Sequence, residues 1–177
     1  MDLNRNWDSQ GYGEGYGSSD NPCSDTYHGI AAISEAETAA SSSWFNRLGA
    51  LSIWGAIDFH AYGEYVLRPY GWPVTATNRD AVLQDIGDAT RDAIESVYDT
   101  RWTSQRSAQL YPAAGGTEDW MFDSTNSNCL AYCFELRGNS FLLPPEEIIL
   151  VVAFSRSVSS CFVLFCFLCL RSHAAER

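Results

Sequence analysis

The architecture of this chain can be worked out from one segment, Ala56-Ile57-Asp58-Phe59-His60-Ala61-Tyr62-Gly63. Its apolar and polar residues alternate, which is typical of a β-strand with two different faces. An aromatic, glycine-containing turn follows at residues 68–72. The pattern predicts a strand over residues 50–60 that ends on His60. Taken alone, such a histidine is either buried in a core and satisfied by a backbone carbonyl, or part of a functional site.

Two helices are expected on either side of this strand. Ser34 and Glu37 have the spacing of a capping box, which predicts a short helix that runs to about Leu48. Asn78 can cap a second helix over residues 79–98. The apolar residues expected on one face of this second helix are Val82, Ile86, Ala93, Ile94 and Val97.

A second apolar strand is expected over residues 129–137, and the glycine-rich, polar residues 9–33 are typical of a long surface loop. Helices that alternate with apolar strands indicate the α/β class. The chain has 177 residues, of which 46% are hydrophobic. This length and composition suit one domain with a sizeable core.

The charge excludes one class of partner. The net charge is −11, with 22 acidic and 11 basic residues. Nucleic acid is therefore not expected as a partner, because the chain offers no basic patch to neutralise phosphates. The first residues also lack the basic and then apolar run of a secretion signal, so any signal would have to lie upstream.

The six cysteines do not form a recognisable disulfide or metal pattern. Cys166 and Cys169 match the CxxC spacing, but their flanks are apolar and no second ligand pair follows, so metal or redox chemistry is not expected there. Cys129 and Cys133 lie four apart in the expected strand, too far along one face to bridge each other. Cys23 stands alone in a polar loop.

Residues 148–170 contain two apolar runs joined by a serine-rich segment with Arg156. Each run alone is too short to span a bilayer, and an arginine near the membrane centre costs about 2.5–3.5 kcal/mol on insertion scales. A membrane-spanning helix is thus marginal here. The alternatives are a buried hydrophobic strand or helix, and non-native sequence from an incorrect reading of the gene.

Four separated stretches become informative when they are read together. They are Asn4-Arg5-Asn6-Trp7, then Asn21-Pro22-Cys23-Ser24-Asp25-Thr26-Tyr27-His28-Gly29 with Ser34-Glu35, then Asp58-Phe59-His60-Ala61-Tyr62-Gly63, and finally Phe134-Glu135-Leu136-Arg137 with Phe141-Leu142-Leu143-Pro144. This set resembles the zinc metallocarboxypeptidases of the carboxypeptidase A type, in family order. The resemblance implies that residues 1–149 are the C-terminal part of an α/β catalytic domain, with a partial mixed sheet and flanking helices. Residues 150–177 form an apolar tail outside it.

The resemblance implies a hydrolase that removes C-terminal residues from peptides with zinc-activated water. His60 corresponds to a zinc ligand, and Glu135 to the general base and acid, whose pKa an apolar setting would raise. Arg5, with Asn4, corresponds to the pair that binds the terminal carboxylate of the substrate, for which a guanidinium is well shaped. The family also implies an extracellular, secreted location.

Three further residues line the substrate site by resemblance. Tyr111 matches a mobile tyrosine that closes over the bound end, and Tyr62 matches a second tyrosine of the site. Glu118 falls at the base of the pocket for the departing side chain, where an acidic group favours C-terminal Arg or Lys. Each residue also has a simpler interpretation. Glu118 can point to solvent, Arg5 can be solvated, the tyrosines can be surface aromatics, and Glu135 can pair with Arg137.

The family takes its other two zinc ligands from a His-x-x-Glu motif upstream of the Asn-Arg-Asn-Trp stretch. Here that spacing occurs at His173 and Glu176, in the wrong order, and is interpreted as coincidence. A zinc site normally has three protein ligands and a water, so this truncated chain is expected to be inactive. The alternatives are a non-catalytic module that binds peptide C-termini, and a fragment tethered to a membrane through residues 148–170.

Overall fold

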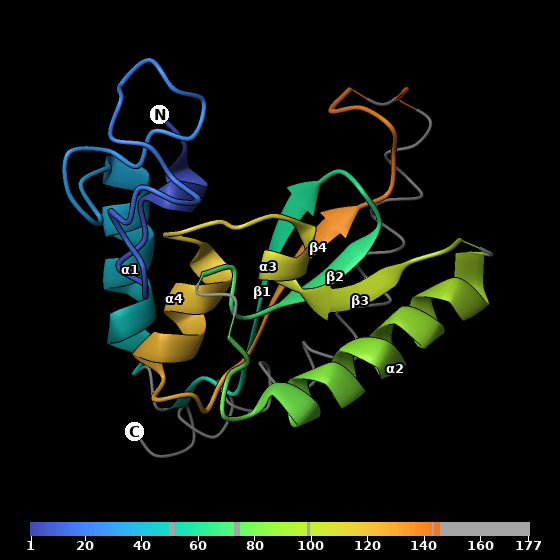
Figure 1. Ribbon diagram of the computed structural model, residues 1–177. Coiled ribbons are helices and arrows are strands. Elements are labelled where there is room, and N and C mark those ends of the chain that lie inside the picture. Colours follow the sequence, from blue (N-terminus) through green and yellow to red (C-terminus); the bar gives the residue numbers. More distant parts are fainter. Residues whose placement is uncertain (50–51, 73–74, 99, 143, 146–177) are drawn as a thin grey trace.

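The computed structural model describes residues 1–49, 52–72, 75–98, 100–142 and 144–145, and within them a four-stranded sheet lies between helices (Figure 1). The elements in chain order are η1 Leu3–Arg5, α1 Ala36–Leu48, β1 Gly55–Ala61, β2 Tyr65–Arg68, α2 Asp80–Tyr98, β3 Thr103–Arg106, α3 Ser107–Leu110, α4 Thr117–Ser124 and β4 Leu130–Leu136. The predicted α/β class with a mixed sheet is confirmed.

The sheet has the order β1-β4-β2-β3. β1 runs parallel to β4, β2 runs parallel to β3, and β2 pairs with β4 in the antiparallel sense. The two strands expected from the sequence are both present, with β1 beginning five residues later than predicted. The four-residue strands β2 and β3 were not expected. Each is too short and too polar at its ends to show the alternation of apolar and polar residues that identifies a strand.

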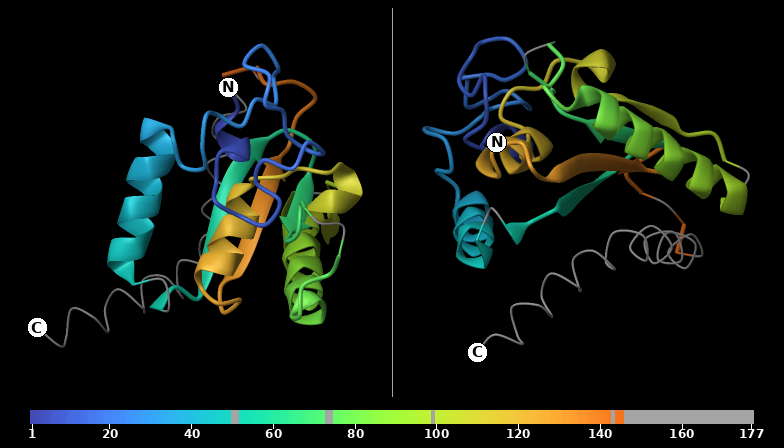
Figure 2. Two further views of the ribbon diagram at one scale, coloured as in Figure 1. Left: turned by 60° about the vertical axis from the view of Figure 1, so that its left-hand side comes forward. Right: turned by 90° about the horizontal axis from the view of Figure 1, so that it is seen from below.

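One face of the sheet is covered by α2, which lies along β2 and β3 (Figures 1 and 2). The buried stripe of this helix passes through Leu83 and Ile94, whereas Val82 and Val97 are 44% and 59% exposed. The predicted apolar face of α2 is therefore right at Ile86 and Ile94, which pack in the core, and wrong at Val82 and Val97. Gly87 belongs to the true stripe, where a Cβ atom would lie 2.8 Å from Ser104 Oγ, so its lack of a side chain lets the helix approach the sheet.

The opposite face is covered by α4, against which α1 and the N-terminal segment pack. The Trp120 ring on α4 lies 4.6 Å from that of Trp7 and 4.8 Å from that of Phe45, measured between centroids. The N-cap of α1 is Glu35, and its side chain makes no capping hydrogen bond. The predicted capping box is therefore wrong, since Ser34 Oγ instead donates to the Glu35 carboxylate.

Buried Asn6 ties the N-terminal segment to the start of α1. Its Nδ2 group donates to the carbonyl oxygens of His28 and Ala31, and its Oδ1 accepts from Thr38 Oγ1 at 2.6 Å. This network fixes the loop that precedes α1.

Across the residues described, none of the helices is both long and apolar enough to cross a membrane. The apolar residues 148–170 lie outside the described residues.

Candidate metal and substrate site

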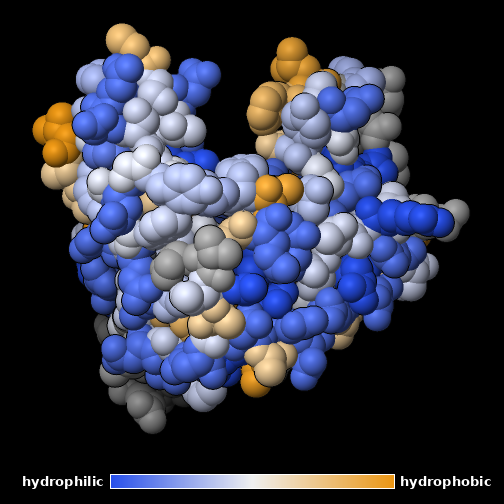
Figure 3. Space-filling view, in the orientation of Figure 1, coloured by the Kyte–Doolittle hydropathy of each residue, from blue (hydrophilic) through white to orange (hydrophobic). Residues whose placement is uncertain are grey.

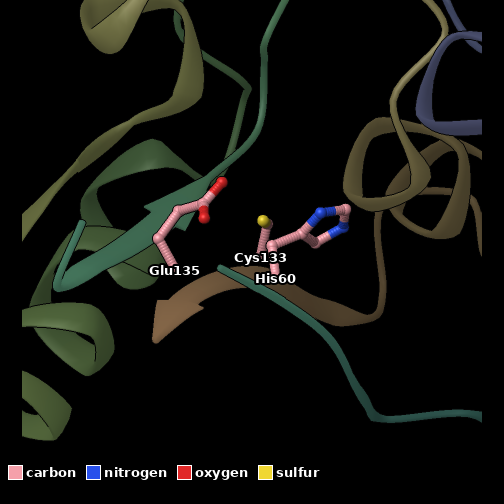
Figure 4. Close-up of side chains that lie close together, drawn as sticks. All are labelled: His60, Cys133 and Glu135. Carbon is pink, nitrogen blue, oxygen red and sulfur yellow. The ribbon is translucent and has the colours of Figure 1, made fainter. Parts of the chain in front are cut away.

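The strands β1 and β4 place four ionisable side chains on one face of the sheet. Their parallel register pairs Asp58 with Cys133 and His60 with Glu135. Because side chains alternate along a strand, residues two apart share a face, so these two pairs form a compact group. Figure 4 shows three of the four side chains, with the Cys133 sulfur between the His60 imidazole and the Glu135 carboxylate.

His60 is held by Asp58. The Nε2 atom of His60 lies 2.7 Å from Asp58 Oδ2, and since a carboxylate only accepts, Nε2 carries the proton. This hydrogen bond is the main cause that raises the pKa of His60, against the opposing effect of burial. It leaves Nδ1 with its lone pair available, because no other hydrogen bond reaches this ring from the described residues. A histidine oriented in this way fits a zinc ligand.

Glu135 lies beside His60 with one carboxylate oxygen, Oε2, buried and without a hydrogen-bond partner in the described part of the chain. Burial is the main cause that raises its pKa, and the carboxylates of Glu118 and Asp58 raise it further, while His60 lowers it. The direction agrees with the one predicted from the sequence. A raised pKa favours the proton exchange that a general base and acid must carry out.

Glu118 is buried beneath this group, with only 4% of its surface exposed. Ser107 Oγ donates to its Oε1 at 2.7 Å, and Oε2 is buried without a partner among the described residues. The alternative that Glu118 points to solvent is therefore wrong. An unpartnered buried carboxylate oxygen of this kind is costly unless a donor or a cation reaches it.

The neighbouring Asp119 has a structural role. It is fully buried, and its carboxylate accepts hydrogen bonds from the backbone N–H groups of Gly71 and Trp72. These bonds attach the turn after β2 to α4. The pKa of Asp119 is raised well above its usual value because the group is buried and lies next to Glu118.

Arg5 is 7% exposed, so the alternative of a solvated arginine is wrong. Its Nε donates to Gly17 O and its Nη1 to Asn4 O, at 2.9 and 2.8 Å. Gly115, with a φ of +79°, packs so closely on Arg5 that a Cβ atom would overlap the Arg5 carbonyl. The N-terminal segment is thereby held against the loop that leads into α4.

Asn4 and Tyr111 lie beside Arg5. Asn4 Oδ1 accepts from the backbone N–H and the hydroxyl of Thr117, both at 2.9 Å, which turns its amide nitrogen toward other partners. The Tyr111 ring, which is 51% exposed, has its centroid 6.0 Å from the Arg5 guanidinium carbon. Tyr62 follows β1 and is 41% exposed, with its ring 5.1 Å from that of Phe141.

A cavity of about 220 Å³ joins the N-terminal segment to β1, with Asn4, Thr117, Asp58 and His60 among its lining residues. The space-filling view shows a notch between the N-terminal loops and the carboxyl ends of β1 and β4 (Figure 3). Two of the residues singled out from the sequence, Asn4 and His60, thus line one hollow together with Asp58 and Thr117.

Sequence reasoning missed two members of this group, Asp58 and Cys133. Each lies two residues before a candidate, in the patterns Asp-x-His and Cys-x-Glu, so strand alternation could have placed it on the same face. Cys133 is 3% exposed, and its pKa is raised chiefly by burial, then by the carboxylates of Glu118, Glu135 and Asp58.

Comparisons with known proteins point to one family. The profile of the family described as "Zinc carboxypeptidase" matches residues 1–153. The chain is 36% identical to zinc carboxypeptidase A 1 of Anopheles gambiae over 155 residues, which cover 84% of this chain and 35% of that protein. It is 38% identical to carboxypeptidase A5 of Macaca fascicularis, over 84% of this chain and 34% of that protein. The chain thus spans about a third of the length of these curated relatives.

Solved structures give the same result. The crystal structure of thrombin activatable fibrinolysis inhibitor matches with a TM-score of 0.80 and 28% identity, over 90% of this chain and 41% of that one. The bovine form of that protein, in complex with tick carboxypeptidase inhibitor, matches with a TM-score of 0.78 and 28% identity, over 99% of this chain and 57% of that one.

Proposed function

The chain belongs to the zinc carboxypeptidase family, and on that basis we propose that it serves in a hydrolase that removes C-terminal residues from peptides. In this proposal the chain supplies the general base, one metal ligand and the groups that bind the substrate's terminal carboxylate. The observation that carries the proposal is the register of β1 and β4, which sets His60 beside Glu135 on one sheet face.

His60 is the residue proposed to hold zinc, through Nδ1, with Asp58 fixing its ring from the other side. Zinc held there together with further ligands would supply Lewis-acid chemistry that activates water and the scissile carbonyl. One histidine does not complete a hydrolytic site, which normally has three protein ligands. The family reaction therefore requires ligands beyond His60, and we expect residues 1–177 alone to bind peptide ends without cleaving them.

Glu135 is proposed as the general base. Its carboxylate takes the proton of the attacking water and then donates it to the leaving amine, so the group must change protonation state during each cycle. Burial, which raises its pKa, brings the carboxyl closer to the range where both steps proceed. The partnerless Oε2 leaves one oxygen ready to accept that proton.

Arg5 and Asn4 are proposed to bind the substrate's terminal carboxylate. The guanidinium uses its Nε and one Nη1 bond to hold the backbone, which fixes its orientation and leaves further N–H groups for a ligand. The Asn4 amide is oriented by Thr117 in the same way. Tyr111 is proposed to close over the bound end, and Tyr62 to line the site.

Glu118 is proposed to select a basic C-terminal side chain. A buried carboxylate with one partnerless oxygen is costly unless a cation reaches it. An Arg or Lys side chain of the substrate provides that cation, whereas an apolar side chain leaves the charge unpaired. A preference for C-terminal Arg or Lys over Phe follows.

A second candidate function is a non-catalytic module that recognises peptide C-termini. The positions of Arg5, Asn4 and Tyr111 favour it, because carboxylate binding needs these residues and no metal. We also propose an extracellular location, as the family resemblance implies. Residues 1–177 are expected to bind without cleaving under either function, so the two are separated by the effect of zinc on binding of a peptide that ends in Arg. Binding that zinc strengthens and that His60→Ala makes insensitive to zinc supports the hydrolase, and binding that neither zinc nor His60→Ala changes supports the module.

A further inference from the structure

We propose that Cys133 forms, with His60 and Glu135, a mixed nitrogen, sulfur and oxygen site that binds a thiophilic divalent cation of the Zn²⁺, Co²⁺ or Cd²⁺ type. The inference deepens the proposed function, on which it rests for His60 as a metal ligand, and it adds Cys133, a ligand that carboxypeptidase chemistry does not use.

The geometry of the three residues carries the proposal. One ligand-type atom from each, a His60 ring nitrogen, Cys133 Sγ and a Glu135 carboxylate oxygen, lies within 4.8 Å of the other two. Ligands around a tetrahedral cation lie about 3.5 Å apart, given metal–ligand distances of about 2.0–2.3 Å. Small side-chain rotations close the difference. Figure 4 shows that the sulfur already lies between the other two groups.

The other polar contacts of these side chains leave the needed atoms available. His60 is hydrogen-bonded to Asp58 through Nε2, so its other ring nitrogen has no partner among the described residues. Glu135 Oε2 is buried and unbonded within those residues, so its rotation breaks no hydrogen bond. Cys133 forms no disulfide with any described residue.

Electrostatics favour a cation at this point. Carboxylates of Asp58, Glu118 and Glu135 lie near the Cys133 sulfur. A divalent ion bound among them would offset part of this negative charge and stabilise a coordinated thiolate.

Binding of the cation by Cys133 releases one proton. The S–H bond of Cys133 breaks, the sulfur–metal bond forms with both electrons from sulfur, and one proton passes to solvent. Sulfur and imidazole ligands select Zn²⁺, Co²⁺ and Cd²⁺ over Mg²⁺ and Ca²⁺, which prefer oxygen. The selectivity of this site is therefore set by Cys133.

The test is a titration of the full chain with Co²⁺. Binding is monitored through the near-ultraviolet absorption that arises from sulfur-to-cobalt charge transfer. The titration uses a chain in which Cys23, Cys161, Cys166 and Cys169 are replaced by serine, so that these thiols cannot bind Co²⁺. We expect a band that saturates at one equivalent of Co²⁺, that Zn²⁺ and Cd²⁺ remove by competition, and that excess Mg²⁺ leaves unchanged.

Substitutions at three residues test whether the charge-transfer band arises from this site. Cys133→Ser should abolish it and weaken Co²⁺ binding at least tenfold, whereas Cys129→Ser, at another buried cysteine just before β4, should keep it. His60→Ala changes a partly exposed side chain and should weaken the band at least tenfold, so the site stays testable if Cys133→Ser fails to fold.

A band that persists in Cys133→Ser, or a folded chain that shows no charge-transfer band at any Co²⁺ concentration, would overturn the proposal. Neither result bears on peptide binding, which is measured without Co²⁺. Failure of this inference is thereby distinguished from failure of the proposed function.

Discussion

His60 Nε2 lies 2.7 Å from Asp58 Oδ2, and the two residues are two positions apart on the same face of β1. The carboxylate determines which ring nitrogen is protonated and hence which one can bind a metal. The strand spacing creates this pair, since alternation places every second side chain on the same side.

Replacement of Asp58 tests this relationship. Asp58→Asn keeps the shape but removes the charge, and we expect the affinity of the chain for Co²⁺ to fall by about 10- to 100-fold. Affinity is measured by competition with a chelator. Asp92→Asn, at an exposed aspartate on α2, serves as the matched control and should bind Co²⁺ like the wild type. Equal affinities in Asp58→Asn and the control would contradict the orienting role.

Replacement of Arg5 tests carboxylate binding. Arg5→Lys retains the charge but loses the planar fork, and a hydrogen bond to a charged group contributes about 1.5–3 kcal/mol. We expect at least tenfold weaker binding of a peptide with a free C-terminus, measured by calorimetry. Arg91→Lys, on the exposed side of α2, should bind as the wild type does. Unchanged affinity in a folded Arg5→Lys chain would remove Arg5 from the site.

Replacement of Glu118 tests side-chain preference. Glu118→Gln retains the hydrogen bond from Ser107 but removes the buried charge. We expect wild-type binding of a peptide ending in Arg to exceed that of the matching Phe peptide by about tenfold or more, and the variant to lose this difference, since charge pairs of this kind are worth about 2 kcal/mol or more. Glu14→Gln is the exposed control. A wild type that binds both peptides equally would refute the assignment.

Asp119 makes stability depend on pH. Its pKa is raised in the folded state above the unfolded value of about 4, so the folded chain binds more protons between the two values. This contribution to stability is complete below about pH 4 and is lost as the pH rises through the raised pKa. Asp119→Asn should lack it. Thermal melting from acidic to neutral pH should therefore show the melting temperature of the variant gaining on that of the wild type as pH increases, and a constant difference would contradict the shift.

The strand β1 lies at the edge of the described sheet, and nearby aromatic residues are exposed, with Trp54 at 65% and Phe59 at 41%. Open edges with apolar neighbours promote association between chains. We expect light scattering to rise with concentration, and Trp54→Lys to reduce it. Trp44→Lys, on α1, is the control for removal of an exposed tryptophan away from the edge. A wild-type chain that stays monomeric at all concentrations would argue against this prediction.

The sequence was sufficient to predict the longer helices and strands, but it did not predict how the strands pair. Alternation around His60 and Glu135 identified β1 and β4, and helical spacing identified α2, although its buried stripe runs through Leu83 rather than Val82. The four-residue strands β2 and β3 are too short to leave a periodic signal. Strand order and register are properties of tertiary contacts, so the pairing of His60 with Glu135 could not be derived from either segment.

The same reason explains which site residues were missed. Cys133 is an apolar-looking residue inside a strand pattern, and its position beside His60 depends on the parallel pairing of β1 with β4. The burial of Glu118 and Arg5 likewise depends on contacts between distant segments, with Ser107 and Gly17 as their partners. Motif order singled out Glu118 and Arg5 but could not say how their side chains are held.

The most direct test of the account compares a peptide that ends in a free C-terminal Arg with the same peptide amidated at its C-terminus, both titrated into the full chain by calorimetry. The arrangement of Arg5, Asn4 and Glu118 predicts that the free acid binds at least tenfold more tightly than the amide. Equal affinities for the acid and the amide, measured on a folded chain, would contradict it.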